Sequence, residues 1–175
     1  MTLSVHRSSV ATFEVTLEAF AKILDKAAAY AATKRFDPKI YLTLRFRPDM
    51  FTFARQVQGF CDHAKNAAAR LAGVEAPRFE NNEATLDELK ARIEKTVRYI
   101  KSLDRAAIDQ GATRSILLAT GKNTNIRMQG ADYLLHDALP NYYFHLTTAY
   151  DLLRYAGVEI GKRDFLGAVP GIMQA

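Results

Sequence analysis

The sequence predicts an all-α protein, a four-helix bundle with a small β-hairpin before the last helix. Four long segments carry apolar residues three and four positions apart, which is the spacing of one buried face of an amphipathic helix. Helices of this kind pack as a bundle whose sites are built from side chains on facing helices. No repeat, low-complexity run or linker divides the sequence, so residues 1–175 are expected to form one domain.

The first helix is predicted from residue 9 to about residue 34. Its apolar face consists of Val10, Phe13, Leu17, Phe20, Leu24, Ala27 and Ala31. Asp37-Pro38 then stops it, because the residue before a proline disfavours the helical conformation. Residues 39–47 alternate like a strand but have no nearby strand to pair with, which indicates an ordered extended loop.

The second helix is predicted to open at Pro48-Asp49, where the Asp49 side chain would accept from amide groups of the first turn. Its buried face consists of Phe53, Val57, Phe60, Ala64, Ala67 and Leu71. Gly73 is expected to end the helix, because glycine readily adopts the left-handed conformation found after many helix ends. Residues 74–84 then form a loop.

The third helix is expected to begin at a capping box, in which Thr85 and Glu88 satisfy free amides of the first turn. Its buried face consists of Leu86, Leu89, Ile93, Val97, Ile100 and Leu103. The pattern fades near Asp104. Two short runs, 115–120 and 125–128, flank a Gly-Lys-Asn-Thr turn and predict the β-hairpin.

The last helix is predicted from residue 130 to residue 157. Pro140 lies inside it, and the missing amide and the ring clash predict a kink or a break there. After it, residues 158–175 contain glycines and a proline at short intervals. This tail is expected to wrap the bundle as an irregular segment.

A candidate site follows from His145, which lies among apolar positions of the last helix. At about 100° per residue, the positions within about 40° of it are Leu134, Ala138, Ala149, Leu152 and Ala156. His145 is therefore expected to point into the core, with Asn141 on the same wall and Thr148 on its flank. On the second helix, His63 lies about 80° from the centre of the buried face, on the flank of Gln56, and could reach an inter-helix cavity from the edge.

The other histidines and the cysteine are expected to have no role in this site. His136 lies on the opposite side of the last helix, and His6 precedes the first helix. Cys61 is about 200° around the helix from His63, so we interpret it as a buried thiol and not as a nucleophile paired with that histidine. A single cysteine excludes an intramolecular disulfide and agrees with a reducing compartment.

Charge and hydropathy limit the classes of partner that the protein is expected to have. The net charge of +5 and the isoelectric point near 9.3 raise the question of nucleic acid. However, the basic residues in 85–105 are mixed with acidic ones, as on a solvated helix face, so no nucleic-acid partner is expected. No apolar run is long enough for a signal peptide or a membrane span, which favours a cytoplasmic protein without a membrane partner.

Several motifs resemble a known superfamily. A histidine within CDHAKNAAARLAG, a hairpin before the last helix, and a histidine followed twelve residues on by the glycine of YAGVEIG resemble the DinB/YfiT-like four-helix bundles. Within that superfamily, RPDMF, LPNYYFH and GKRDFLG look like a bacterial family whose function is uncharacterised. The resemblance covers nearly the whole chain and implies a DinB-like bundle.

The resemblance also implies a metal site. In that superfamily three histidines commonly hold a divalent metal, one from the second helix and two spaced four apart on the last. His63 and His145 match two of these positions, but Asn141 occupies the third. An amide oxygen is a weaker ligand than imidazole for zinc, nickel or iron, so the expected site is incomplete. Gln56 and Thr148 are expected to line the substrate pocket, with Thr148 orienting a water or substrate.

Two function classes remain open. The first is a metal-dependent transferase or hydrolase acting on a small molecule, since superfamily members include thiol transferases. The alternative is a metal-free ligand-binding or interaction protein that has lost the metal triad. Tyr143 and Tyr150 lie roughly opposite His145, and exposed aromatic residues at successive turns favour a homodimer.

Overall fold

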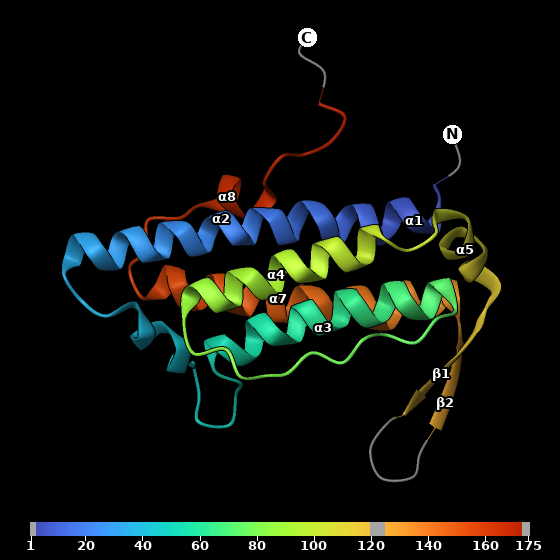
Figure 1. Cartoon of the computed structure of the whole chain (residues 1–175), viewed down its shortest axis with the longest axis horizontal. Helices are drawn as coiled ribbons and strands as arrows, with labels where there is room; N and C mark the ends of the chain where they lie inside the picture. Colours follow the sequence, from blue (N-terminus) through green and yellow to red (C-terminus); the bar gives the residue numbers. More distant parts are fainter. Residues whose placement is uncertain (1–2, 120–124, 173–175) are drawn as a thin grey trace.

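The computed structural model describes residues 3–119 and 125–172, and it shows a helical bundle with one small hairpin (Figure 1). Helices α2, α3, α4 and α7 run alongside one another, and the hairpin leaves the bundle at one end. The elements are α1 (Val5–Ser8), α2 (Val10–Lys34), η1 (Pro38–Thr43), α3 (Phe53–Ala72), α4 (Leu86–Lys101), α5 (Arg105–Gln110), η2 (Gly111–Thr113), β1 (Ser115–Ala119), β2 (Asn125–Gln129), α6 (Gly130–Tyr133), η3 (Leu134–Ala138), α7 (Leu139–Tyr155) and α8 (Lys162–Leu166).

The predicted apolar faces of α2 and α3 form the core. All seven predicted positions of α2 and all six of α3 are buried. Aromatic rings connect the helices, with the Phe20 and Phe60 centroids 4.9 Å apart and the Phe13 and Tyr142 centroids 4.7 Å apart. Gly73 ends α3 at a φ of 74°, as predicted from its position.

The segment between α2 and α3 differs from the prediction. Residues 38–43 form a 3-10 helix, which begins where the Asp37 side chain accepts from the Lys39 amide at 2.9 Å. Helix α3 begins at Phe53, and its first turn is capped by Thr52 and not by Asp49. The Phe53 amide donates to the Leu44 carbonyl at 2.8 Å, a contact between the two ends of this segment that local sequence does not reveal.

Thr85 caps helix α4, and its hydroxyl accepts from the Glu88 amide at 3.1 Å as predicted. The Glu88 carboxylate accepts from the Ala84 amide, which lies one residue before the Thr85 amide that a capping box would use. Val97 and Leu103 are only partly buried. Beyond α4, the Asp104 side chain caps α5, a short helix that the apolar pattern did not predict.

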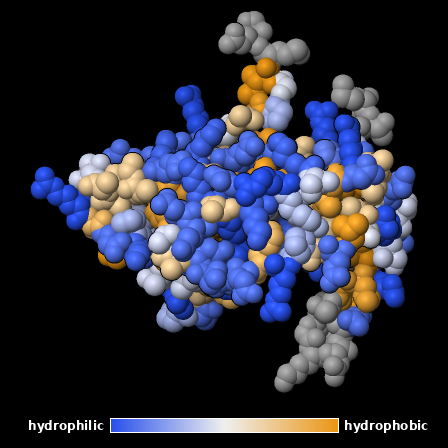
Figure 2. Space-filling model, in the orientation of Figure 1, coloured by the Kyte–Doolittle hydropathy of each residue, from blue (hydrophilic) through white to orange (hydrophobic). Residues whose placement is uncertain are grey.

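The hairpin is confirmed within the described residues. Strands β1 and β2 pair antiparallel, with Ile116 opposite Met128. Thr120, which we expected to extend the first strand, and the predicted turn at 121–124 lie outside the described residues. Leu117 and Ile126 are exposed, and Figure 2 shows hydrophobic atoms near the hairpin and on the C-terminal tail, in contrast to the mainly hydrophilic face over α2 and α4.

The last helix is interrupted as Pro140 predicted. A π-helical turn, η3, separates α6 from α7, and Pro140 lies in the first turn of α7. Proline offers no amide to the residue four positions earlier, so the regular hydrogen-bond ladder cannot run through this point. The tail is more ordered than expected, because it contains α8, and Asp164 of α8 bonds Lys26 of α2 at 2.7 Å. Across the described residues, no helix has the length and apolarity to cross a membrane.

Candidate histidine site

The packing of α3 against α7 brings His63 and His145 together. Their ring centroids are 5.3 Å apart and the ring planes differ by 21°. Gly59 makes the approach possible, because a Cβ at that position would lie 3.1 Å from Cγ of His145. The bundle therefore places two imidazoles, one from each helix, side by side in a partly buried position.

His145 is held by Gln56. The imidazole Nδ1 lies 2.7 Å from the Gln56 side-chain oxygen, and the Gln56 amide nitrogen donates to the Phe51 carbonyl at 3.4 Å. Since an amide oxygen only accepts hydrogen bonds, Nδ1 must carry the proton. The second ring nitrogen of His145, Nε2, then has a free lone pair. Gln56, which is only 1% exposed, thus fixes both the orientation and the tautomer of His145.

Two phenylalanines complete the surroundings of His145. The Phe51 ring lies nearly parallel to the imidazole, with centroids 6.0 Å apart, and the Phe144 ring meets it edge-on at 5.3 Å. Phe51 is 50% exposed and Phe144 is 57% exposed. The His145 ring is therefore nearly parallel to both the His63 and the Phe51 rings, at the edge of the bundle where aromatic side chains reach solvent.

His145 lies at the edge of the buried face of α7. The buried residues of α7 are Tyr142, Leu146, Thr148, Ala149, Leu152 and Leu153, and His145 itself is partly buried. The expectation that it points into the core is therefore met in part, because its ring packs beside Gly59 and Gln56 of α3 at the rim of the core. His136 is exposed, and Cys61 is fully buried, with burial raising the pKa of its thiol to about 12.

Asn141 and Thr148 are not hydrogen-bonded to the histidines. The Asn141 amide nitrogen donates to the Asp137 carbonyl at 2.8 Å, and the Thr148 hydroxyl donates to the Phe144 carbonyl at 2.7 Å. Both side chains thus satisfy carbonyl groups of the preceding turn, a common use of short polar side chains within helices. Of the two residues expected to line a pocket, Gln56 contacts His145 and Thr148 does not bond it.

The electrostatic surroundings keep both imidazoles neutral. Burial, followed by the neighbouring His63 and Arg55, lowers the pKa of His145 to about 4. Burial also lowers the pKa of His63, against the opposing influence of Asp137. A lowered histidine pKa means that the charged form is disfavoured in the folded protein. At neutral pH the site therefore presents uncharged nitrogen acceptors.

The donor set does not fit the three-ligand metal centre that the resemblance implies. Two imidazoles are present, and the third position is Asn141, whose amide oxygen is a weaker ligand than imidazole for zinc, nickel or iron. Across residues 3–119 and 125–172, no group of three histidine, cysteine or carboxylate side chains is placed to hold a metal. Catalytic zinc sites in proteins ordinarily have three protein ligands, so this chain provides fewer than such a centre needs.

The prediction that Tyr143 and Tyr150 are exposed is wrong. Tyr143 and Tyr150 are partly buried, and the Tyr150 ring packs against Phe165 of α8 with centroids 5.4 Å apart. The aromatic residues that α7 exposes are Phe144 and Tyr155. The tail was expected to be irregular, whereas it forms α8, whose Phe165 packs against Tyr150. The homodimer stays a prediction.

Comparison with known proteins agrees with this architecture. Residues 5–166 match a family described as a domain of unknown function, DUF1993. The chain belongs to the DUF1993 family. A crystal structure of a DinB family member protein from Shewanella denitrificans matches with a TM-score of 0.88 and 37% sequence identity, covering 97% of this chain and 95% of that chain. No curated protein matches the sequence. The resemblance to a DinB-like family is thereby confirmed for this DUF1993 chain.

Proposed function

We propose that this DUF1993 protein is a ligand-binding protein that uses His145 without a tightly held metal. The hydrogen bond between His145 and Gln56 supports this best, because it leaves the imidazole Nε2 as a fixed, uncharged acceptor. The exposed rings of Phe51 and Phe144 flank this acceptor. The ligand class that matches an acceptor between aromatic walls is a small aromatic molecule with an O–H or N–H donor.

Phenol tests the ligand class directly. We expect phenol to bind the wild type about fivefold more tightly than toluene, because only phenol can donate to His145, and such a bond is worth about 1 kcal/mol. His145→Phe keeps a ring between His63 and Phe51 but removes the acceptor, so it should abolish the preference. The measurement is a titration followed by amide chemical shifts in NMR spectra.

The matched control is His136→Phe, which changes an exposed histidine of η3, outside the site, and should keep the preference for phenol. Equal affinity of the wild type for phenol and toluene would contradict the proposed hydrogen bond. Retention of the preference in His145→Phe would do the same, since the donor would then bind elsewhere.

The second candidate is a metal-dependent transferase or hydrolase. The hydrogen bond between His145 and Gln56 is compatible with this candidate, because metal-binding histidines usually have their other ring nitrogen fixed by a hydrogen bond. Two protein imidazoles alone would hold zinc, nickel or iron weakly. The two candidates therefore differ in metal affinity.

Metal content separates the candidates. The wild type, purified without a polyhistidine tag, is expected to contain less than about a tenth of an equivalent of metal and to show no rise in melting temperature with zinc, nickel or manganese. Asn141→His places a third imidazole one turn before His145, so this variant should gain both metal and stability. Stoichiometric metal in the wild type, or equal binding by both proteins, would support the metal-dependent candidate instead.

A further inference from the structure

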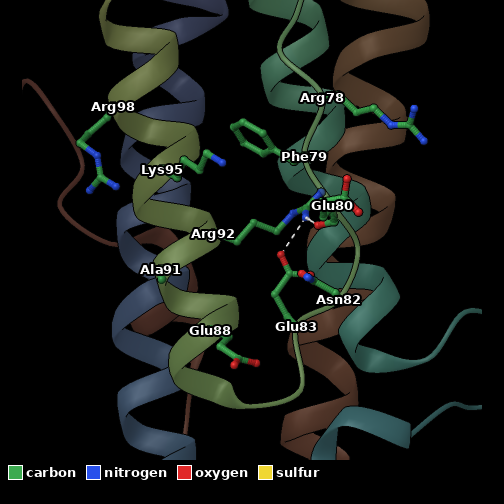
Figure 3. A pocket seen from close by; sticks show the side chains of 10 residues that line it. All are labelled: Arg78, Phe79, Glu80, Asn82, Glu83, Glu88, Ala91, Arg92, Lys95 and Arg98. Carbon is green, nitrogen blue, oxygen red and sulfur yellow. Dashed lines mark hydrogen bonds and ion pairs between the residues drawn. The ribbon is translucent and has the colours of Figure 1, made fainter.

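A second candidate site lies on the face that α4 shares with the segment before it. Residues 78–83 run beside α4 and enclose a cleft of about 470 Å³ (Figure 3). This volume lies within the range of small-ligand pockets, about 300–1,000 Å³. The cleft does not include either histidine of the site described above.

Unpaired positive charge gathers in this cleft. On α4, Lys90 pairs with Asp25 at 2.6 Å, and Lys101 pairs with Glu14. Lys95 and Arg98 have no ion pair among the described residues, and both line the cleft. They are three positions apart on α4, and in Figure 3 the Lys95 side chain points toward Phe79 whereas the Arg98 side chain points away from it.

Phe79 holds Lys95 in place. The Lys95 ammonium lies 4.2 Å from the centroid of the Phe79 ring, and the ammonium of Lys65 lies 4.5 Å from it. Lys65 is balanced by Asp62 at 3.2 Å, whereas Lys95 has no such partner. A cation over an aromatic ring is attracted to it but keeps its full charge for other partners. Lys95 is thus a positioned and uncompensated cation.

Arg92 adds a buried donor without a partner. Its side chain is 2% exposed, and its two terminal nitrogens bond Glu83 and Asp62, but within the described residues Nε bonds nothing. Buried donors without partners are rare in native proteins, and each calls for an explanation such as a ligand or a water. Arg92 lines the same cleft as Lys95 and Arg98.

We propose that this cleft binds a small oxyanion, the phosphate or carboxylate group of a small molecule. Lys95 supplies the positioned charge, Arg98 adds positive charge at the rim, and Arg92 donates through Nε. The acidic residues of the lining do not oppose this position. Glu83 is neutralised by Arg92, Glu88 lies at the far end of the cleft, and Glu80 lies across Phe79 from Lys95 (Figure 3). The anion therefore sits beside Lys95.

Titration calorimetry with inorganic phosphate and with citrate, at constant ionic strength, tests this proposal. Saturable binding of either anion is expected, and the stronger of the two identifies the ligand as phosphate-bearing or carboxylate-bearing. The double variant Lys95→Ala with Arg98→Ala should bind at least about tenfold more weakly, since it removes both cations of the cleft that have no ion pair among the described residues.

The matched control is Lys22→Ala with Arg127→Ala, which removes the same charge from two exposed positions outside the cleft and should bind like the wild type. Equal weakening in both double variants, or no binding of either anion, would overturn the proposal. Because Lys95 packs on Phe79, the site is also mapped in the wild type by amide shifts. Shifts confined to residues 78–98 support the cleft, and shifts centred elsewhere refute it.

Discussion

Gly130→Ala is expected to lower the free energy of unfolding by about 3 kcal/mol or more, because there is no space for the added methyl group. A Cβ on Gly130 would lie 1.9 Å from the carbonyl oxygen of Gly111. A Cβ on Gly111 would in turn lie 2.3 Å from the carbonyl oxygen of Leu71. The obstacles are backbone atoms, so no side-chain rotation can relieve the clash.

This contact fixes where the last helix begins. Gly130 is the first residue of α6, directly after β2, and Gly111 follows α5. Their close approach joins the start of α6 to the end of α3, and the alanine variant must separate them. Chemical denaturation measures the loss.

Gly161→Ala is the matched control. No atom lies within 4 Å of a Cβ at that position, and its φ of −140° is open to any residue. Its stability should stay within about 1 kcal/mol of the wild type. If Gly130→Ala is as stable as this control, the backbone contact does not have the described geometry.

The helix faces could be predicted because burial repeats at the helical period. An apolar residue every three or four positions marks the side that leaves water, and this held at every predicted position of α2 and α3. The interruption of the last helix at Pro140 could also be predicted from the sequence, since it depends only on the missing amide and the ring of proline.

Features that depend on distant contacts could not be predicted. Thr52 caps α3 where the Phe53 amide bonds the Leu44 carbonyl, and this choice places Phe51 outside the helix and against His145. His63, His145 and Gln56 were nevertheless predicted to lie on neighbouring walls, and they do.

Arg92 is buried, although the basic and acidic residues that alternate around it predict a solvated helix face. Its position beside Ile93 and three residues after Leu89, both of which are buried, places it at the edge of the apolar face. A charged residue at such a position must find partners, because an unpaired charge in the interior is costly.

Arg92→Met is therefore expected to lower the free energy of unfolding by about 3–5 kcal/mol. Nη1 of Arg92 donates to the Glu83 carboxylate at 2.8 Å and to the Glu80 carbonyl at 2.7 Å, and Nη2 donates to Asp62 at 3.0 Å. Methionine fills much of the same volume but offers no donor. The side chain of Glu83 is only 10% exposed, so its charge would stay buried without its cation.

A double-mutant cycle distinguishes lost packing from an unpaired charge. Glu83→Gln removes the negative charge and keeps a similar shape, so Arg92→Met combined with Glu83→Gln should lose less stability than the sum of the two single variants. Asp62 retains Lys65 at 3.2 Å in every variant and does not need a new partner. Arg98→Met, at an exposed position of the same helix, should change stability by less than about 0.5 kcal/mol. Strictly additive losses would mean that Arg92 contributes packing alone and that the charge of Glu83 is accommodated by solvent.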